Sequence, residues 1–427
     1  MKIKSLNYPE NKQAINEILL KNRFDFQDER SQAVEMIVND VRDNGDDAVF
    51  KYTEKFDGAK FGELLVSKDE IDEAYSIVED SFIESIRKSI DNVKAFHRKQ
   101  LRENWFDYNN GMTGQVYNPL ARIGAYVPGG RAAYPSSVVM TVIPAKVAGV
   151  EEVVVVSPPD KEGKVNPYTL VAANEAGADE IYKVGGAQAV AALAFGTESI
   201  KAVDKIVGPG NIYVTLAKKM VYGLVDIDML AGPSEVLVLA DENANPDFIA
   251  ADLLSQAEHD PLAVSILITT SDEIAEKTKT AVAKQIKELS KREIAEESIT
   301  NNALVVIVDD LDNGIELVNL FAPEHFELLV QEPFKVLGKI KNAGAIFIGD
   351  YSSEPLGDYM AGPNHVLPTG GTARYASPLN TDDFIKKSSI IYYQKEELEQ
   401  VKDDVIKLAE LEGLDAHANA IKIRFKK

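Results

Sequence analysis

The sequence predicts an α/β protein with two Rossmann-like α/β units, a helical segment before them and a small unit after them. Three observations lead to this fold class. Apolar residues in the first hundred positions recur at helical spacing, short β-branched runs alternate with helical stretches from about residue 122, and a second such series begins near residue 264. This alternation is typical of βα units that build parallel sheets.

The length and composition indicate several packed units. A chain of 427 residues exceeds the size of one hydrophobic core, and its 45% apolar and 27% charged residues are those of an ordinary globular protein. We expect a helical segment over residues 1–120 that packs on the first α/β domain, which covers residues 121–234. A second α/β domain is expected over residues 235–377 and a small unit over residues 378–427.

Each predicted element comes from a local pattern. The helical opening is indicated by two sets of apolar positions, which are Val34, Ile37, Val38 and Val41, and Phe82, Ile86, Ile90 and Val93. The first series of strands is predicted at residues 123–127, 153–157, 181–184, 205–207 and 236–240. The second series is predicted at residues 264–269, 304–308, 326–330 and 345–348. After about Ser377 we expect one strand at residues 389–393 and two helices.

Charge and composition exclude several functions. With 46 basic and 68 acidic side chains the formal net charge is −22, so a surface that binds nucleic acid is not expected. The amino terminus lacks the apolar stretch of a signal peptide, and no uncharged run reaches the roughly 18 residues of a membrane span. We therefore expect a cytoplasmic protein without a membrane partner. The absence of cysteine excludes disulfides, thiolate metal ligands and a cysteine nucleophile.

The first candidate metal ligands are Gln256 and His259. A spacing of three places both side chains on one face of a helix that an Asn-Pro-Asp sequence opens. An amide oxygen and an imidazole nitrogen can both bind a divalent cation. The alternative is a histidine that interacts with the carbonyl groups at the end of the helix.

A second group of candidates can carry out proton transfer. Glu324 and His325 are adjacent before a predicted strand, and a buried carboxylate and imidazole can share such work, although a solvated loop pair is the alternative. Asp358 and His365 lie in a long glycine-rich loop at residues 349–371, and such loops commonly carry function. Glu412 and His417 lie near the end of the chain. Taken together, these residue types can supply the ligands of a catalytic zinc ion.

Three glycine-rich turns could bind a nucleotide. Val-Pro-Gly-Gly at 127–130, Gly-Gly-Ala-Gln at 185–188 and Gly-Pro-Gly-Asn at 208–211 each follow a predicted strand and precede a helix. Backbone amides at the start of a helix can bind phosphate at the carboxyl edge of a sheet. None of the turns matches the dinucleotide fingerprint Gly-x-Gly-x-x-Gly, so an anion site and a purely structural turn both remain open.

At this point the motifs resemble those of one family. The sequence contains Ile-Gly-Ala-Tyr-Val-Pro-Gly-Gly, Gly-Pro-Gly-Asn-Ile-Tyr-Val-Thr, Ala-Gly-Pro-Ser-Glu-Val, Leu-Leu-Ser-Gln-Ala-Glu-His, Ala-Pro-Glu-His, Gly-Asp-Tyr and Glu-Gly-Leu-Asp-Ala-His. These motifs resemble those of the histidinol dehydrogenases, in order, from about Leu120 to His417. The resemblance extends less distinctively to the amino terminus.

The resemblance implies a complete site. It implies two successive NAD-dependent oxidations of L-histidinol, through L-histidinaldehyde to L-histidine, at one zinc ion per subunit of a homodimer with shared active sites. The carboxy-terminal unit would form the dimer contact. The implied zinc ligands are Gln256, His259, Asp358 and, from the neighbouring subunit, His417. The acid–base pair would be Glu324 and His325, and substrate would contact Ser234, His365 and Glu412 as well as His325 and the zinc ligands. The implied NAD contacts are Tyr126, Gln188 and Asn211.

The implied mechanism fits the composition. His325 would remove the alcohol proton, and the aldehyde would be attacked by water activated by Glu324, because the chain has no cysteine to form a thiohemiacetal. Zinc would act chiefly to orient the substrate. Two alternatives stay open: a related zinc and NAD dehydrogenase for another amino or sulfonated alcohol, and a metal- or nucleotide-binding protein without catalysis.

Overall fold

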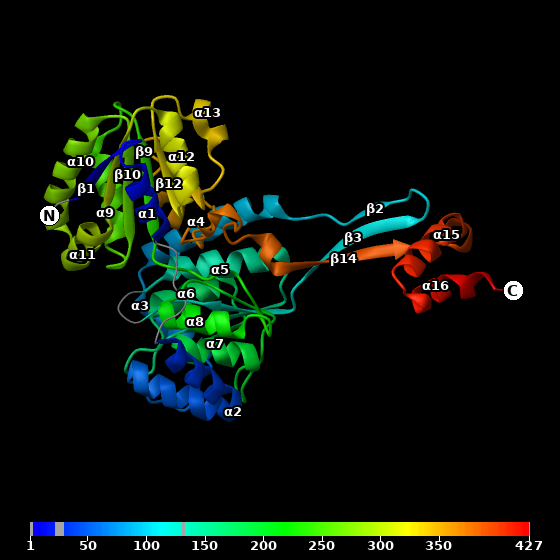
Figure 1. Cartoon of the computed structure of the whole chain (residues 1–427). Coiled ribbons are helices and arrows are strands. Elements are labelled where there is room, and N and C mark those ends of the chain that lie inside the picture. The colour runs from blue at the N-terminus through cyan, green and yellow to red at the C-terminus, as the bar shows by residue number, and fades with distance from the viewer. Residues whose placement is uncertain (1–2, 22–29, 130–132, 427) are drawn as a thin grey trace. The chain divides into compact units, whose positions relative to one another are not determined.

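The computed structural model of the chain describes residues 3–21, 30–129 and 133–426. These form two compact units (Figure 1). The first unit comprises residues 1–100 and 120–384, and the second comprises residues 101–119 and 385–427. Both parallel sheets belong to the first unit, so the predicted α/β fold class is confirmed. The four-part division of the chain stays a prediction, because compact units need not be independently folding domains.

The first sheet is parallel and has the strand order β6-β5-β4-β7-β8. Its strands are β4 (Arg122–Tyr126), β5 (Glu152–Ser157), β6 (Glu180–Lys183), β7 (Lys205–Val207) and β8 (Asp226–Ile227), and its helices are α5 (Pro135–Ala148), α6 (Pro167–Ala176), α7 (Gly186–Phe195) and α8 (Ile212–Val221). Residues 153–156 are four consecutive buried valines, as expected where helices cover both faces of a sheet.

The order of these strands creates a crevice. From β4 the chain continues to β5 and β6 on one side, and then crosses to β7 and β8 on the other side. The carboxyl ends of β4 and β7, which are Tyr126 and Val207, therefore border the point where the strand order reverses. Open α/β sheets bind their ligands at such a point.

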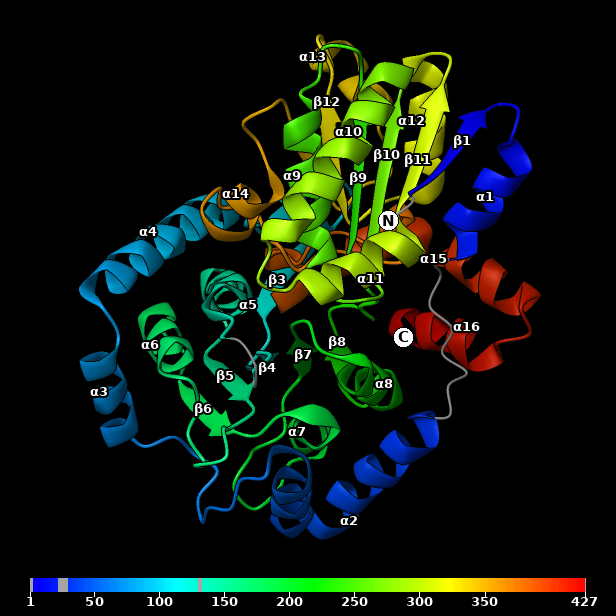
Figure 2. The ribbon, with the colours of Figure 1, turned by 90° about the vertical axis from the view of Figure 1, so that its left-hand side faces the viewer.

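The second sheet is also parallel, with the order β1-β11-β10-β9-β12-β13. Its strands are β1 (Lys4–Tyr8), β9 (Glu235–Ala240), β10 (Val264–Thr269), β11 (Leu304–Val308), β12 (His325–Leu329) and β13 (Ala345–Ile348). Its helices are α9 (Pro246–Ala257), α10 (Asp272–Gln285), α11 (Arg292–Asn302), α12 (Leu311–Phe321), α13 (Pro333–Val336) and α14 (Glu354–Tyr359). One apolar cluster joins α9, α10 and α11 to one face, and another joins α1 and α12 to the opposite face (Figure 2).

The amino-terminal segment is helical except for its first strand. The helices are α1 (Lys12–Lys21), α2 (Arg30–Asp57), α3 (Lys68–Ile77) and α4 (Asp80–His97). Both predicted apolar stripes face the core, and α2 contacts α7 and α8 while α4 contacts α5 and α6. Residues 4–8 were expected within the helical segment, but they form β1, whose partner β11 lies 300 residues further along the chain. No local pattern could reveal that partner.

The second unit contains an antiparallel sheet and two helices. The sheet has the order β14-β3-β2, with β2 (Trp105–Asp107), β3 (Met112–Pro119) and β14 (Ile385–Tyr392). The helices are α15 (Lys395–Leu411) and α16 (Asp415–Lys422). The predicted strand at residues 389–393 is therefore part of a longer one. The expectation of helix up to residue 120 is wrong for residues 105–107 and 112–119, because these strands gain their hydrogen bonds from each other and from the distant β14.

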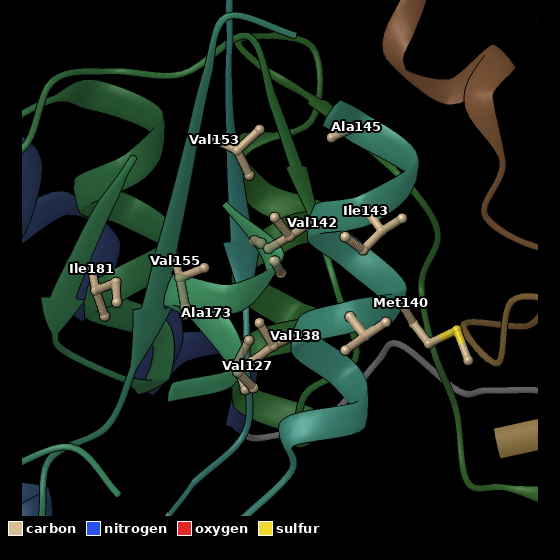
Figure 3. Packing of buried hydrophobic residues seen from close by; sticks show 14 of the residues in the cluster. Val127, Val138, Met140, Val142, Ile143, Ala145, Val153, Val155, Ala173 and Ile181 are labelled. Carbon is tan, nitrogen blue, oxygen red and sulfur yellow. The ribbon is translucent and has the colours of Figure 1, made fainter. Parts of the chain in front are cut away.

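Helix α5 shows why the first sheet holds together. It is apolar on almost every side, and ten consecutive residues from Ser136 to Ala145 are buried. Figure 3 shows Val138, Val142 and Ile143 of this helix beside the sheet residues Val153 and Val155. Such a helix is stable only when it is enclosed, so the covering helices α4 and α6 are part of the same core. None of the helices in the described part of the chain has the length and apolar character needed to span a membrane.

The end of α2 gives a testable consequence for stability. Burial raises the pKa of Asp57 to about 6, and its Oδ2 has no hydrogen-bond partner among the described residues. A raised pKa means that the folded state binds the proton more tightly, so the stabilising effect of the protonated form is lost as the pH rises through about 6. Above that pH the ionised carboxylate destabilises the fold.

We therefore expect Asp57→Asn to raise the free energy of unfolding by about 1–2 kcal/mol at pH 8 and by little near pH 4. Denaturation midpoints at the two pH values measure this difference. An equal effect at both pH values would show that the charge of Asp57 is not the cause.

Candidate active site

Glu324 and His325 lie at the amino edge of the second sheet. Helix α12 ends at Phe321, Ala322 adopts a left-handed conformation with φ of 57°, and β12 begins at His325. Both acid–base candidates are almost completely buried, with exposed fractions of 7% for Glu324 and 5% for His325. The alternative of a solvated loop pair is therefore wrong for these two residues.

One backbone contact sets the protonation of His325. Its Nδ1 lies 3.1 Å from the carbonyl oxygen of Glu235, at the start of β9. A carbonyl oxygen can only accept, so Nδ1 carries the hydrogen and the lone pair is on Nε2. Burial lowers the pKa of His325 to about 4, which keeps the ring neutral. His325 thus presents an unprotonated Nε2 that can serve as a base.

Glu324 is held by the same strand. Its Oε2 accepts a hydrogen bond of 2.9 Å from the backbone N–H of Glu235 and lies 3.7 Å from Nδ1 of His325. Burial raises the pKa of Glu324 well above its usual range, and the nearby charges of Glu235 and Glu354 raise it further. Such a carboxyl group can hold or accept a proton near neutral pH.

Asp358 and His365 come together through the glycine-rich loop. Their Oδ1 and Nδ1 atoms are 3.6 Å apart. Burial would raise the pKa of Asp358, but the nearby imidazole of His365 and the charges of other histidines lower it overall. Helix α4 anchors the loop, because Ser89 Oγ donates to Tyr359 O at 2.6 Å and Asn92 Nδ2 donates to Met360 O at 2.8 Å. The loop predicted between residues 349 and 371 contains the short helix α14.

Gln256 and His259 lie at the end of α9, as predicted. Asn245 caps this helix and Pro246 is its first residue. Gln256 is fully buried, and its amide is placed with the nitrogen toward Glu354, because this orientation gives the amide its hydrogen-bond partners. His259 follows the helix and is exposed. Although much of His259 is exposed, neighbouring residues partly desolvate its ring and lower its pKa, and the charge of Asp358 acts in the opposite direction.

The first unit therefore collects most of the predicted residues. His325 and Asp358 line a cavity of about 580 Å³ together with His365, and Gln256 adjoins His325. Phe347 and Leu356 contribute apolar walls. Ser234, which is half-buried, directly precedes Glu235 and β9.

Glu412 and His417 belong to the second unit. Glu412 follows α15, His417 lies within α16, and both are exposed. Their predicted roles depend on contacts with another subunit and stay predictions.

The predicted NAD contacts surround the crevice of the first sheet. Tyr126 is the last residue of β4, and its hydroxyl accepts a hydrogen bond of 3.1 Å from Gly186 N at the start of α7. Gln188 lies in the first turn of α7, where it is buried and its Oε1 has no partner among the described residues. Asn211 caps α8. Of the three glycine-rich turns, the first extends to Gly130, which is outside the described residues.

A nucleotide fits this crevice. Gly208 has a φ of 109°, and a Cβ atom there would lie 2.2 Å from the carbonyl oxygen of Tyr126. Only glycine allows the two backbone segments to approach so closely. The turn after β7 thus reaches the carboxyl end of β4, and Gln188 offers an amide oxygen that has no partner among the described residues.

The residues around His325 offer donor atoms that suit a divalent cation. Donor atoms of His325, Glu354 and Asp358 all lie within 4.8 Å of one another. Burial raises the pKa of Glu354 well above its usual range, and the charge of Asp358 adds to this effect, so a positive ion would relieve repulsion there. Imidazole nitrogen, carboxylate oxygen and the amide oxygen of Gln256 are all donors that zinc accepts.

Sequence reasoning missed two residues of this site. Glu235 and Glu354 are buried, with exposed fractions of 2% each, yet both are acidic. Glu235 directly follows Ser234 at the start of a strand of apolar residues, where a charged side chain is unusual, and this was an available signal. Glu354 lies inside a polar loop, where an acidic residue is ordinary, so the sequence gave no signal of its burial.

Comparisons with known proteins agree on one family. The family model described as histidinol dehydrogenase matches residues 20–425. The chain is 56% identical over 401 residues to a histidinol dehydrogenase of Heliobacterium mobile, covering 93% of this chain and 94% of the relative. It is 55% identical to one of Clostridium acetobutylicum, with 92% of each chain covered. The crystal structure of histidinol dehydrogenase from Elizabethkingia anophelis matches with a TM-score of 0.94 at 38% identity, covering 99% of this chain and 98% of that one.

The turn at Gly208 depends on a buried ion pair. Lys218 and Asp228 are paired, with side chains only 3% and 1% exposed. Lys218 Nζ also donates to Gly208 O at 3.0 Å, and Gly208 N donates to Asp228 Oδ2 at 2.7 Å. The pair therefore fixes both backbone groups of the glycine.

We expect Lys218→Met to lower the free energy of unfolding by about 3–5 kcal/mol, because it leaves a buried carboxylate without its cation. The double change Lys218→Met with Asp228→Asn should restore most of the loss. Chemical denaturation measures both, with Lys219→Met at the exposed neighbour as the control. If the double variant is no more stable than the single one, the unpaired charge is not the cause.

Proposed function

Because the chain belongs to the histidinol dehydrogenase family, we propose that it oxidises L-histidinol through L-histidinaldehyde to L-histidine, with two molecules of NAD. The family assignment makes the chain an oxidoreductase of histidine biosynthesis. The observation that carries the detailed proposal is the neutral, buried His325, whose free Nε2 borders the same cavity as Asp358 and His365.

The proposed NAD site is the crevice of the first sheet. Tyr126, Gln188 and Asn211 would contact the dinucleotide, which accepts one hydride in each oxidation when bound. The support is the reversal of strand order between β4 and β7 and the close approach of Gly208 to Tyr126. Residues 228–234 run from this edge directly to β9, so a ligand in the crevice would be near the catalytic edge of the second sheet.

The proposed zinc ligands are Gln256, His259 and Asp358, with His417 of a second subunit. When bound, zinc holds substrate groups by Lewis acidity and neutralises the buried carboxylates. Ser234, His365 and Glu412 are proposed substrate contacts. The lowered pKa of Asp358 keeps it ionised, as a ligand must be.

The proposed proton transfers use His325 and Glu324. His325 Nε2 accepts the alcohol proton in the first oxidation, and Glu235 O stabilises the resulting imidazolium through Nδ1–H. In the second oxidation Glu324 takes a proton from the water that attacks the aldehyde. Since the chain has no cysteine, a covalent thiohemiacetal is excluded. Because burial favours its neutral form, Glu324 acts as a base only beside compensating positive charge.

We also propose a homodimer with shared active sites, working in the cytoplasm. The support is the exposure of Glu412 and His417 in the second unit, outside the unit that holds the other site residues. A dimer would allow this unit to complete the site of a neighbouring copy.

The primary test measures NADH formation with L-histidinol. We expect two NADH per histidinol, loss of activity on chelation and recovery when zinc returns, because substrate orientation depends on the ion. A chelated enzyme with full activity would contradict the zinc dependence, and one NADH per substrate would contradict the second oxidation.

Glu324→Gln should separate the activation of water from the binding of zinc. We expect it to lower overall oxidation by about 10²-fold or more, since it removes the base for water, while zinc content stays near that of the wild type. Steady-state rates and metal analysis measure both quantities. Loss of bound metal instead would contradict the role assigned to Glu324.

Mixing two inactive variants tests the shared site. Glu324→Gln and His417→Asn, dissociated and reassembled together, should recover about a quarter of wild-type activity, because half of the dimers are mixed and each mixed dimer has one intact site. If both residues act within one chain, the mixture should stay inactive.

A further inference from the structure

Glu354 is a buried carboxylate that the proposed reaction does not use. It is the first residue of α14, and only 2% of it is exposed. Its backbone N–H donates to Glu327 Oε1 at 3.2 Å, and Ser255 Oγ lies 3.4 Å from its Oε2. Glu354 is therefore held from two elements, its backbone by the strand β12 and its side chain by the helix α9.

The contact that matters is with Gln256. The amide nitrogen of Gln256 donates to the carboxylate of Glu354, at 2.9 Å from Oε1 and 3.0 Å from Oε2. The nitrogen also lies 3.2 Å from Nδ1 of His325, but Nδ1 donates its own hydrogen to Glu235 O and so cannot accept one. A primary amide has one end that donates and one end that accepts. Because the carboxylate engages the donating end, the amide oxygen is turned away from Glu354 and is left to bind something else.

Glu354 has a different relation to His325. Its Oε1 lies 3.9 Å from Nε2, which is too long for a hydrogen bond. The ring is instead held through Nδ1 by Glu235 O. The removal of Glu354 should therefore disturb the amide of Gln256 before it disturbs the histidine.

We propose that Glu354 is a positioning residue that holds the Gln256 amide by its nitrogen, so that the amide oxygen faces the bound cation. This inference rests on the proposed zinc dependence. Groups that orient metal ligands in this way commonly change metal affinity by 10–100-fold when they are removed.

A competing role is that Glu354 binds the cation itself. Its carboxylate, His325 and Asp358 offer donor atoms within 4.8 Å of one another, so the geometry permits this. Two substitutions separate the roles. Glu354→Gln keeps an acceptor oxygen at the same reach but removes the charge, whereas Glu354→Asp keeps the charge and draws the acceptor back by one methylene.

The experiment measures the zinc dissociation constant of the full-length enzyme by competition with a chelator. For positioning, we expect Glu354→Gln to weaken zinc binding by about fivefold or less, since only a charge-assisted bond becomes neutral. Glu354→Asp and Glu354→Ala should weaken it by roughly 10–100-fold. Asp57→Asn is the control for the loss of a carboxyl group whose pKa is raised by burial, because Asp57 ends α2, which packs on helices of the first sheet, and it should leave zinc affinity unchanged.

If Glu354→Gln weakens zinc binding more than Glu354→Asp does, the proposal is overturned, because that ranking indicates that Glu354 binds the cation directly or acts through its charge. Unchanged affinity in all variants, or a wild type that binds no zinc, would also overturn it. Thermal melts of the metal-free variants show whether each one folds. If Glu354→Ala does not fold, the zinc affinities of Glu354→Gln and Glu354→Asp decide between the two roles.

A double-mutant cycle gives a second measurement. If Glu354 acts through Gln256, Glu354→Asp should have little further effect on zinc affinity once Gln256→Ala is present. Additive losses would contradict positioning. Zinc affinity is measured without turnover, so the ranking of the Glu354 variants tests the positioning role alone. The proposed function is tested separately, and it fails if NADH formation by the wild type does not depend on zinc.

Discussion

The structure depends on a concentration of buried acid around one neutral histidine. Glu235, Glu324, Glu354 and Asp358 lie at or near the amino edge of the second sheet, and ring nitrogens of His325 and His365 lie 3.6–3.9 Å from carboxyl oxygens of three of them. Burial raises the pKa of Glu235 to about 8 and that of Glu324 and Glu354 well above their usual range. Such an arrangement is costly unless a cation compensates it, so the acid cluster and the proposed metal site are two aspects of one constraint.

The fold brings this cluster toward the proposed nucleotide site of the first sheet. The first sheet offers its carboxyl edge, where glycine-rich turns follow β6 and β7, and the second offers its amino edge, where Ser234, Glu324 and His325 are located. Residues between them are tied together, because Thr369 Oγ1 accepts from Gly232 N at 2.6 Å and Gly370 N donates to Glu235 at 3.1 Å. Meanwhile Asp241 closes the carboxyl end of β9, where its Oδ2 accepts from Gln331 N at 2.7 Å.

Much of this fold was predictable from the sequence, because most of its elements are specified by patterns of neighbouring residues. Buried parallel strands such as β5 and β10 are continuous apolar runs, so their ends agree with prediction within a residue or so. Strand β1, and β3 with its partner β14, depend on pairing with distant segments and leave only weak alternation. In the site, motif residues could be named, but Glu354 could not, because its role comes from a contact with Gln256 in space.

The most direct test of the whole account is a crystal structure of the zinc-loaded enzyme with anomalous diffraction at the zinc edge. The account predicts one peak per chain, bonded to Gln256 Oε1, His259 and Asp358 and completed by His417 of the neighbouring copy, beside the cavity that His325 lines. A peak away from these residues, or a zinc ion bound to the nitrogen-facing side of Gln256, would contradict it.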